Sequence, residues 1–195
     1  MNKLPIYNIK VGNNEGITKM SLVLHPAVES DFLAFSEHKK KEMKFSIDEE
    51  KHNVLGVALR ADYPIYRVFG DLECYVVFDK DTIDALYQKF MMEDRGGIVN
   101  LEHSEDTDGV HLIQSFIKDK ELGINPTGWE DIEDGSWFVM YHISNEEVWE
   151  KIKSGEFKGF SVECTVDVNV NEDEKTEKEP SDINTLDELL NYIKN

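Results

Sequence analysis

The sequence predicts a mainly β protein of the α+β class, with an antiparallel barrel or sandwich of short strands and helices packed outside it. Roughly seven or eight short segments show strand-like patterns of apolar residues. Turn residues separate several of them, and a few stretches repeat apolar residues at helical spacing. A chain of 195 residues with 40% hydrophobic content can bury one compact core and carry appendages.

Charge and hydropathy argue against two classes of partner, and the formal net charge of −19 argues against the first. A polyanion repels nucleic acid at long range, so we expect no direct DNA or RNA partner. No apolar run reaches the roughly eighteen residues that a membrane span requires, so we expect no membrane partner. The first ten residues lack the apolar stretch of a secretory signal, and the chain is expected to stay where it is made.

The chain divides into four predicted segments. Residues 1–43 form an irregular lead-in with one strand-like patch, and residues 44–170 form a β-rich domain. Residues 171–182 are an acidic linker with almost nothing apolar to bury. Residues 183–195 repeat leucine and isoleucine at helical spacing and predict a short amphipathic helix. This helix either packs on the parent domain or docks elsewhere as a tethered segment.

The β-rich domain begins with two predicted hairpins. The first has strands over 45–47 and 54–59 around a polar turn, and the second has strands over 63–69 and 72–78 around Gly70-Asp71. Further strands are predicted over 98–101, 110–117, 137–143 and 160–170.

Two helices are predicted within this domain. The first is capped by Asp79 or Asp81 and stops at Gly96-Gly97. The second begins at the capping-box sequence of residues 144–147. Before the second helix, residues 118–135 form an insertion that is long for a structureless loop, and we expect it to cover part of the domain.

The strand over 160–170 carries candidate chemistry. Alternation places Ser161 and Glu163 on the face opposite the valines. Residues two apart on a strand are about 6.5–7 Å apart, which roughly matches an imidazole hydrogen-bonded on both sides. A histidine from elsewhere could therefore bridge them. On this segment alone, a solvent-facing polar surface is the simpler interpretation.

The six histidines differ in their setting. His103 follows the apolar strand over 98–101, and catalytic side chains are often mounted at strand ends, so position favours His103 as a general base. His111 and His142 lie inside strands and are either wall residues or partners in a triad. The remaining histidines have charged or structural settings: His25, His38 and His52.

The sequence supports metal, cofactor and thiol chemistry less well than it supports serine–histidine chemistry. Residues 104–109 resemble the opening of a calcium loop, but Ser115 stands where that loop needs a bidentate glutamate. No second histidine lies close to His103 in sequence, as a zinc site would require. We predict no metal and no cofactor. Cys74 and Cys164 are expected to be reduced core residues, which disfavours Cys164 as a nucleophile.

A series of short motifs runs from residue 16 to residue 168. Its strongest parts are residues 100–103, 115–117, 135–137 and 147–161, and weaker parts lie at residues 16–27, 31–35, 54–58 and 64–67. In order and spacing, these motifs resemble the XkdF-type phage serine proteases, which are relatives of the prohead maturation proteases of tailed phages. The resemblance implies a small β-barrel of the herpesvirus assemblin and prohead protease type, with helices around it.

The resemblance also implies site residues. Ser161 occupies the position of the nucleophile in a Gly-Phe-Ser element, and His103 that of the base in an Asn-x-x-His element. No histidine follows Ser161, which excludes an assemblin-like second histidine there. Strand geometry favours Glu163 as the third member, with Asp167 and His111 as alternatives.

One departure from the commoner prohead pattern, G-x-S-x-G, concerns the oxyanion site. Glu163 stands where a glycine is usual, and that glycine permits close backbone approach. The groups that donate hydrogen bonds to the oxyanion are therefore either backbone amides or one of three arginines: Arg60, Arg67 and Arg95.

The biology implied by the resemblance is phage capsid maturation. The enzyme would act as a serine endopeptidase that cleaves scaffold protein, the major capsid protein precursor and itself. It would work in the host cytoplasm inside the assembling prohead, as a homodimer if it follows the assemblins, with retention in the virion left open. Two alternatives remain: an inactive structural or scaffold-associated capsid assembly protein that keeps the protease fold, and an acidic β-rich interaction domain.

Overall fold

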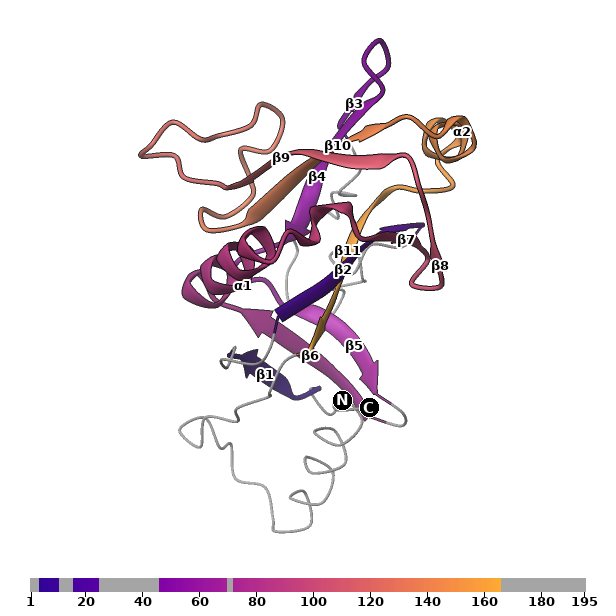
Figure 1. Ribbon diagram of the computed structural model, residues 1–195. Coiled ribbons are helices and arrows are strands. Elements are labelled where there is room, and N and C mark those ends of the chain that lie inside the picture. The colour runs from indigo at the N-terminus through magenta and orange to yellow at the C-terminus, as the bar shows by residue number, and fades with distance from the viewer. Residues whose placement is uncertain (1–3, 11–15, 25–45, 70–71, 166–195) are drawn as a thin grey trace.

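The computed structural model describes residues 4–10, 16–24, 46–69 and 72–165 (Figure 1). Strands dominate these residues and two α-helices accompany them, which confirms the predicted α+β class. The strands are β1 (Ile6–Ile9), β2 (Gly16–Val23), β3 (Ser46–Asp48), β4 (Asn53–Leu59), β5 (Ile65–Phe69), β6 (Leu72–Phe78), β7 (Val99–Leu101), β8 (Glu105–Asp106), β9 (Val110–Ile117), β10 (Trp137–Ile143) and β11 (Gly159–Thr165). The helices are α1 (Lys80–Met92), the short 3₁₀ turn η2 (Arg95–Gly97) and α2 (Glu146–Ser154).

The strands form three sheets, with the orders β3-β4-β10-β9, β11-β2-β7-β8 and β1-β6-β5. In Figure 1 these sheets lie at the top, in the middle and at the bottom of the molecule. Within the described residues the three sheets do not close into a barrel, so the expectation of a closed barrel is wrong for this part of the chain. The upper and middle sheets meet where β11 lies against β4, with no ladder assigned between these strands.

Local signals explain most element boundaries. The two predicted hairpins form as the antiparallel pairs β3–β4 and β5–β6. The Asp79 side chain caps α1 by accepting a hydrogen bond from the Thr82 amide at 2.8 Å. The cap of α2 is Asn145 rather than Ser144, because the Asn145 side chain accepts from the first amides of the helix.

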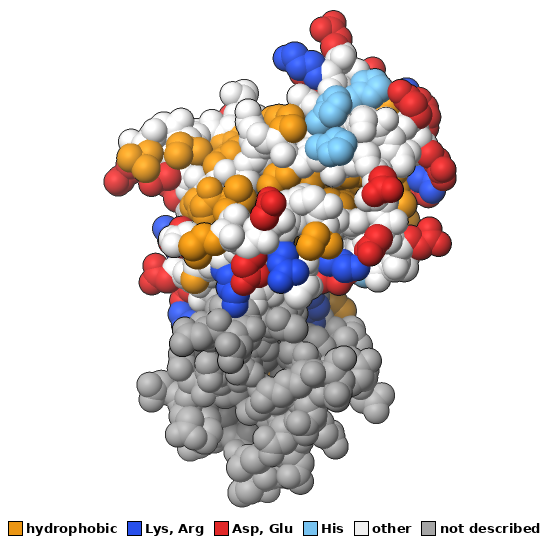
Figure 2. Space-filling model, in the orientation of Figure 1, with side chains coloured by type: hydrophobic (Ala, Val, Ile, Leu, Met, Phe, Trp, Pro, Cys, Tyr) orange, Lys and Arg blue, Asp and Glu red, His pale blue; other side chains and the backbone are white. Residues whose placement is uncertain are grey.

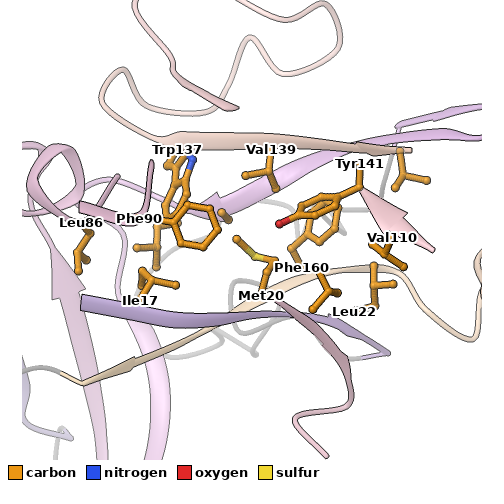
Figure 3. Close-up of a cluster of buried hydrophobic side chains, with 14 of the residues drawn as sticks. Ile17, Met20, Leu22, Leu86, Phe90, Val110, Trp137, Val139, Tyr141 and Phe160 are labelled. Carbon is orange, nitrogen blue, oxygen red and sulfur yellow. The ribbon is translucent and has the colours of Figure 1, made fainter. Parts of the chain in front are cut away.

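The main core lies between the middle sheet, β10 and α1 (Figure 3). Met20 and Leu22 of β2 point into it together with Phe160 of β11. The Trp137 ring of β10 packs edge-on against Phe90 of α1 at 5.0 Å between ring centroids. Burial of the apolar face of β2 and β11 fixes the middle sheet and leaves its other face for polar residues.

The insertion over residues 118–135 covers part of the upper sheet. Trp129 and Ile132 pack there against Phe138, in a second, smaller core. Lys118 is fully buried beneath the insertion, and its ammonium donates to the carbonyls of Trp129 at 2.7 Å and Ile132 at 2.5 Å. Burial lowers the pKa of Lys118. The insertion is therefore a structured cover, held by a buried cation.

The predicted lead-in supplies two strands to the fold. β1 pairs in parallel with β6, and β2 lies between β11, which is antiparallel to it, and β7, which is parallel to it. The predicted antiparallel arrangement is therefore wrong for these two parallel pairs, which both use strands from the lead-in. The predicted linker and the terminal helix, residues 171–195, lie outside the described residues. Neither α1 nor α2 has the length and apolar character needed to span a bilayer.

Candidate active site

Three polar side chains lie in one row across the middle sheet. Ser161 of β11 is paired with Ser21 of β2, and Ser21 is paired with Asn100 of β7. Their chain neighbours point into the core, so alternation places all three on the opposite face. Ser161 is 6% exposed, Ser21 0% and Asn100 2%. Buried polar groups of this kind need partners inside the protein.

An unusual backbone turn brings an imidazole to this row. Glu102 and His103 follow β7 with φ angles of 49° and 57°, so two consecutive residues other than glycine are left-handed. Such residues cost roughly 1–3 kcal/mol each and persist only where surrounding contacts hold them. The Glu102 amide donates to the Leu22 carbonyl at 3.0 Å, and the Glu102 carboxylate accepts from the Leu24 amide at 2.5 Å. The turn is thereby tied to the end of β2.

His103 joins the row to a carboxylate. Its Nδ1 lies 2.8 Å from Ser21 Oγ and 3.1 Å from Glu163 Oε1. The same Glu163 oxygen accepts a hydrogen bond of 2.6 Å from Asn100 Nδ2. The side chains of His103 and Glu163 are 40% and 32% exposed, so the cluster reaches from a buried strand face to the surface.

The contact with Glu163 decides which nitrogen carries the proton. An ionised carboxylate only accepts hydrogen bonds, so Nδ1 of His103 must carry a hydrogen that points toward it. In the neutral imidazole, Nε2 is then the basic nitrogen. This is the protonation pattern in which an acid orients the base of a hydrolytic triad.

A lysine contributes positive charge beside Glu163. Lys19 is the cross-strand neighbour of Glu163 and forms an ion pair with Asp106 at 2.5 Å. The hydrogen bond to Asp106 raises the pKa of Lys19, and the charges of Asp106 and Glu163 add to this shift. Lys19 thus places a positive charge next to the carboxylate that contacts the imidazole.

The structure brings together two of the three predicted triad residues. His103 and Glu163 are in contact, and Ser161 lies on the same strand face as Glu163, two positions away. Among the hydrogen bonds of the described residues, the hydroxyl that meets His103 belongs to Ser21 and not to Ser161. The role of Ser161 as nucleophile stays a prediction.

Sequence reasoning gave no role to two members of the cluster. Ser21 has the position of an ordinary polar strand residue, and its partners lie about 80 and 140 positions further along the chain. Asn100 belongs to the Asn-x-x-His element, and its contact with Glu163 was not foreseen. The buried Asn100 Oδ1 has no hydrogen-bond partner in the described part of the chain.

His111, an alternative third member of the triad, is not part of the cluster formed by Ser21, Asn100, His103 and Glu163. His111 lies on β9 of the upper sheet, paired with His142, and its Nε2 is 3.3 Å from Ser144 Oγ. Figure 2 shows histidine side chains gathered near the top of this face. The sheet that holds His111 and His142 shares no strand with the middle sheet. Asp167 lies outside the described residues, as does the side chain of Cys164. Cys74 is buried, which raises the pKa of its thiol to about 11.

The three candidate arginines make contacts elsewhere. Arg60 forms an ion pair with Glu133 at 2.5 Å, Arg95 is 3.1 Å from Glu93, and Arg67 donates to the Tyr66 carbonyl at 3.0 Å. The identity of the oxyanion donors stays a prediction. Over the described ranges, no group of three or more histidine, cysteine, aspartate or glutamate side chains is arranged to hold a metal ion.

The carboxylate at Nδ1 of His103 matches the acid–imidazole pair of serine hydrolases, in which the nucleophilic hydroxyl lies at the other ring nitrogen. The hydroxyl in contact with His103, that of Ser21, lies at Nδ1 as well. Comparison with protein families identifies the class independently. The chain belongs to the family described as "Putative phage serine protease XkdF", whose model matches residues 42–170.

Two curated relatives, both from Bacillus subtilis (strain 168), extend the comparison. The uncharacterised protein YqbD is 28% identical over 126 residues, which cover 59% of this chain and 38% of YqbD. The phage-like element PBSX protein XkdF is 28% identical over 142 residues, which cover 73% of this chain and 46% of XkdF. The chain thus spans less than half the length of either relative. No solved structure matches significantly.

Proposed function

We propose that this protein is a serine endopeptidase of phage assembly, with Ser161 as nucleophile, His103 as general base and Glu163 as the acid that orients the base. Its substrates are scaffold protein, the major capsid protein precursor and the protease itself. The expected homodimer and the location inside the prohead in the host cytoplasm belong to the same proposal.

The contact between His103 Nδ1 and Glu163 Oε1 at 3.1 Å is the observation that carries this proposal. It supplies the acid–imidazole half of a triad at the end of a strand, where a strained turn holds the imidazole. Ser161 supports the serine half because it shares a strand face with Glu163 and neighbours Ser21, which already contacts the ring.

The chemical steps follow from these roles. Ser161 Oγ attacks the carbonyl carbon of the scissile peptide, and its proton passes to His103 Nε2. The tetrahedral intermediate collapses to an acyl-enzyme as His103 returns that proton to the leaving amine. A water molecule then attacks the ester, gives its proton to His103 and releases the acid product, and the proton returns to Ser161. Glu163 stabilises the imidazolium in both halves.

A cleavage assay tests the proposal. Purified full chain is incubated with its capsid precursor, as the wild type and as Ser161→Ala, and products are followed by gel electrophoresis. We expect the wild type to cleave and the variant to be inactive. Cleavage by Ser161→Ala would reject Ser161 as the nucleophile.

A structural capsid assembly protein that keeps the protease fold is the second candidate. The low exposure of Ser161, 6%, favours it, because a nucleophile must be reached by substrate. Absence of cleavage by both the wild type and Ser161→Ala would support this candidate and reject the enzymatic one.

A further inference from the structure

Ser21 holds a position that the proposed triad does not use. It is fully buried, in the central strand between β11 and β7, and its hydroxyl lies 2.8 Å from Nδ1 of His103. Buried hydroxyls in sheets are usually satisfied by backbone groups or other side chains. Here the partner is the one histidine that the site depends on.

We infer that Ser21 is a positioning residue for His103: its hydroxyl oxygen accepts the Nδ1–H hydrogen bond together with Glu163 and so sets the ring and its tautomer. This inference rests on the proposed function and deepens it. It adds a second acceptor to the acid that orients the base, contributed by β2 while Glu163 comes from β11.

The direction of the hydrogen bond follows from Glu163. If the Ser21 hydroxyl donated to Nδ1, the nitrogen would present a lone pair to the carboxylate oxygen 3.1 Å away, and two acceptors would repel each other. With the hydrogen on Nδ1, Ser21 and Glu163 are both acceptors, and the single N–H is shared between them. Ser21 therefore acts on the side of the ring opposite to the basic Nε2.

The contact with Nδ1 distinguishes Ser21 from Ser161, since both serines are buried. Ser21 contacts the nitrogen that carries the hydrogen, so it is poorly placed to give up its own proton to the ring. Ser161 is its cross-strand neighbour, at the usual strand separation of about 4.8 Å. A ring anchored above β2 by Ser21 thus lies one strand away from the proposed nucleophile.

The tautomer of His103 tests this inference directly, because imidazole ¹⁵N chemical shifts distinguish Nδ1–H from Nε2–H without any need for activity. The full chain is labelled with ¹⁵N-histidine, and His103 is assigned with a His103→Gln variant. We compare wild type, Ser21→Ala and Ser21→Cys at a pH where the ring is neutral. Cysteine fills the space with a much weaker acceptor, so it separates the hydrogen bond from packing.

We expect the Nδ1–H tautomer to predominate in wild type. In both Ser21 variants the ratio of Nδ1–H to Nε2–H should fall about fivefold, as expected for loss of one ordinary hydrogen bond. Ser136→Ala is the matched control, because Ser136 is also fully buried but accepts from the Ala61 amide at 3.0 Å, far from the site. An unchanged ratio in Ser21→Ala and Ser21→Cys would overturn the inference.

A second readout uses the capsid precursor. Ser21→Ala and Ser21→Cys should lower kcat about tenfold with little change in KM, because the ring is less well oriented while substrate contacts remain. Two results together would make Ser21 the nucleophile and reject the positioning role. These are complete loss of cleavage in both Ser21 variants and an organophosphonate adduct on Ser21 of the wild type. A wild type that neither cleaves nor reacts, with the tautomer shift intact, would reject the proposed function and leave the positioning contact supported.

Discussion

The described residues contain two serine–histidine contacts in different surroundings. Ser21 and His103 meet at 2.8 Å on the middle sheet, with a buried serine, a carboxylate on the same ring nitrogen and a left-handed turn beneath the histidine. Ser144 and His111 meet at 3.3 Å on the upper sheet, where both residues are exposed and the serine also donates to the Gly109 carbonyl. In the described part of the chain, no carboxylate contacts His111.

This difference shows what separates a candidate site from a surface contact. A hydroxyl near an imidazole is common where polar residues crowd on a strand end. The middle sheet adds an acid that sets the tautomer, burial that strengthens the hydrogen bonds, and backbone strain that surrounding contacts must offset.

The two histidines give the largest expected contrast. His103→Ala removes the proposed base, and we expect cleavage of the capsid precursor to fall by about 10⁶-fold, to background. His111→Ala should cleave at the wild-type rate, since His111 lies on the other sheet. Cleavage is measured by gel densitometry. Equal losses in the two variants would show that His103 has no role in cleavage that His111 lacks.

Replacement of the acid gives the next largest effect. In Glu163→Gln, the amide can present N–H to His103 and favour the other tautomer, so kcat should fall by about 10⁴-fold. Glu156→Gln is the control, because Glu156 lies on the surface, where its carboxylate is 4.0 Å from the Lys151 ammonium. A Glu163→Gln enzyme with a rate within twofold of the wild type would remove Glu163 from the site.

Asn100 holds the acid in place and should have a smaller effect. Asn100→Ala removes the 2.6 Å hydrogen bond to Glu163, which leaves that carboxylate free to turn away from His103. We expect kcat to fall roughly tenfold to a hundredfold in steady-state kinetics. An unchanged kcat would mean that Glu163 is held by its other contacts alone.

Ser136→Ala gives the smallest effect on function and a clear one on stability. The change leaves the buried Ala61 amide without its acceptor and should cost about 1–3 kcal/mol in the free energy of unfolding, measured by urea titration. Its rate of cleavage should match that of the wild type. A rate loss as large as that of the Ser21 variants would indicate that buried serines act only through stability.

Local parts of the fold could be predicted from the sequence. The strand over Trp137–Ile143, the hairpin pairs and the Asp79 cap follow from alternation, turn residues and capping, which depend on near neighbours. The cap of α2 was placed one residue early, because Ser144 and Asn145 are both good caps. Non-local pairing was not predictable: nothing near β2 shows that it lies between β11 and β7.

The candidate site shows the same division. His103 and Glu163 were predicted from a strand end and from strand alternation, and their contact depends on a fold that brings them together across 60 positions. Ser21 and Asn100 were missed because their roles arise from sheet register, which sequence spacing does not contain. The strand count left a barrel and a sandwich open, because it does not specify which edges pair, and the closed barrel was an expectation from the family resemblance.

Reaction with an organophosphonate, followed by peptide mass spectrometry, tests the central claim most directly. The full-length wild type should carry one adduct on Ser161, and His103→Ala should carry none, because the hydroxyl then has no base. An adduct on any other residue, or a wild type that stays unmodified in a folded state, would contradict the assignment of Ser161 and His103 as a hydrolytic pair.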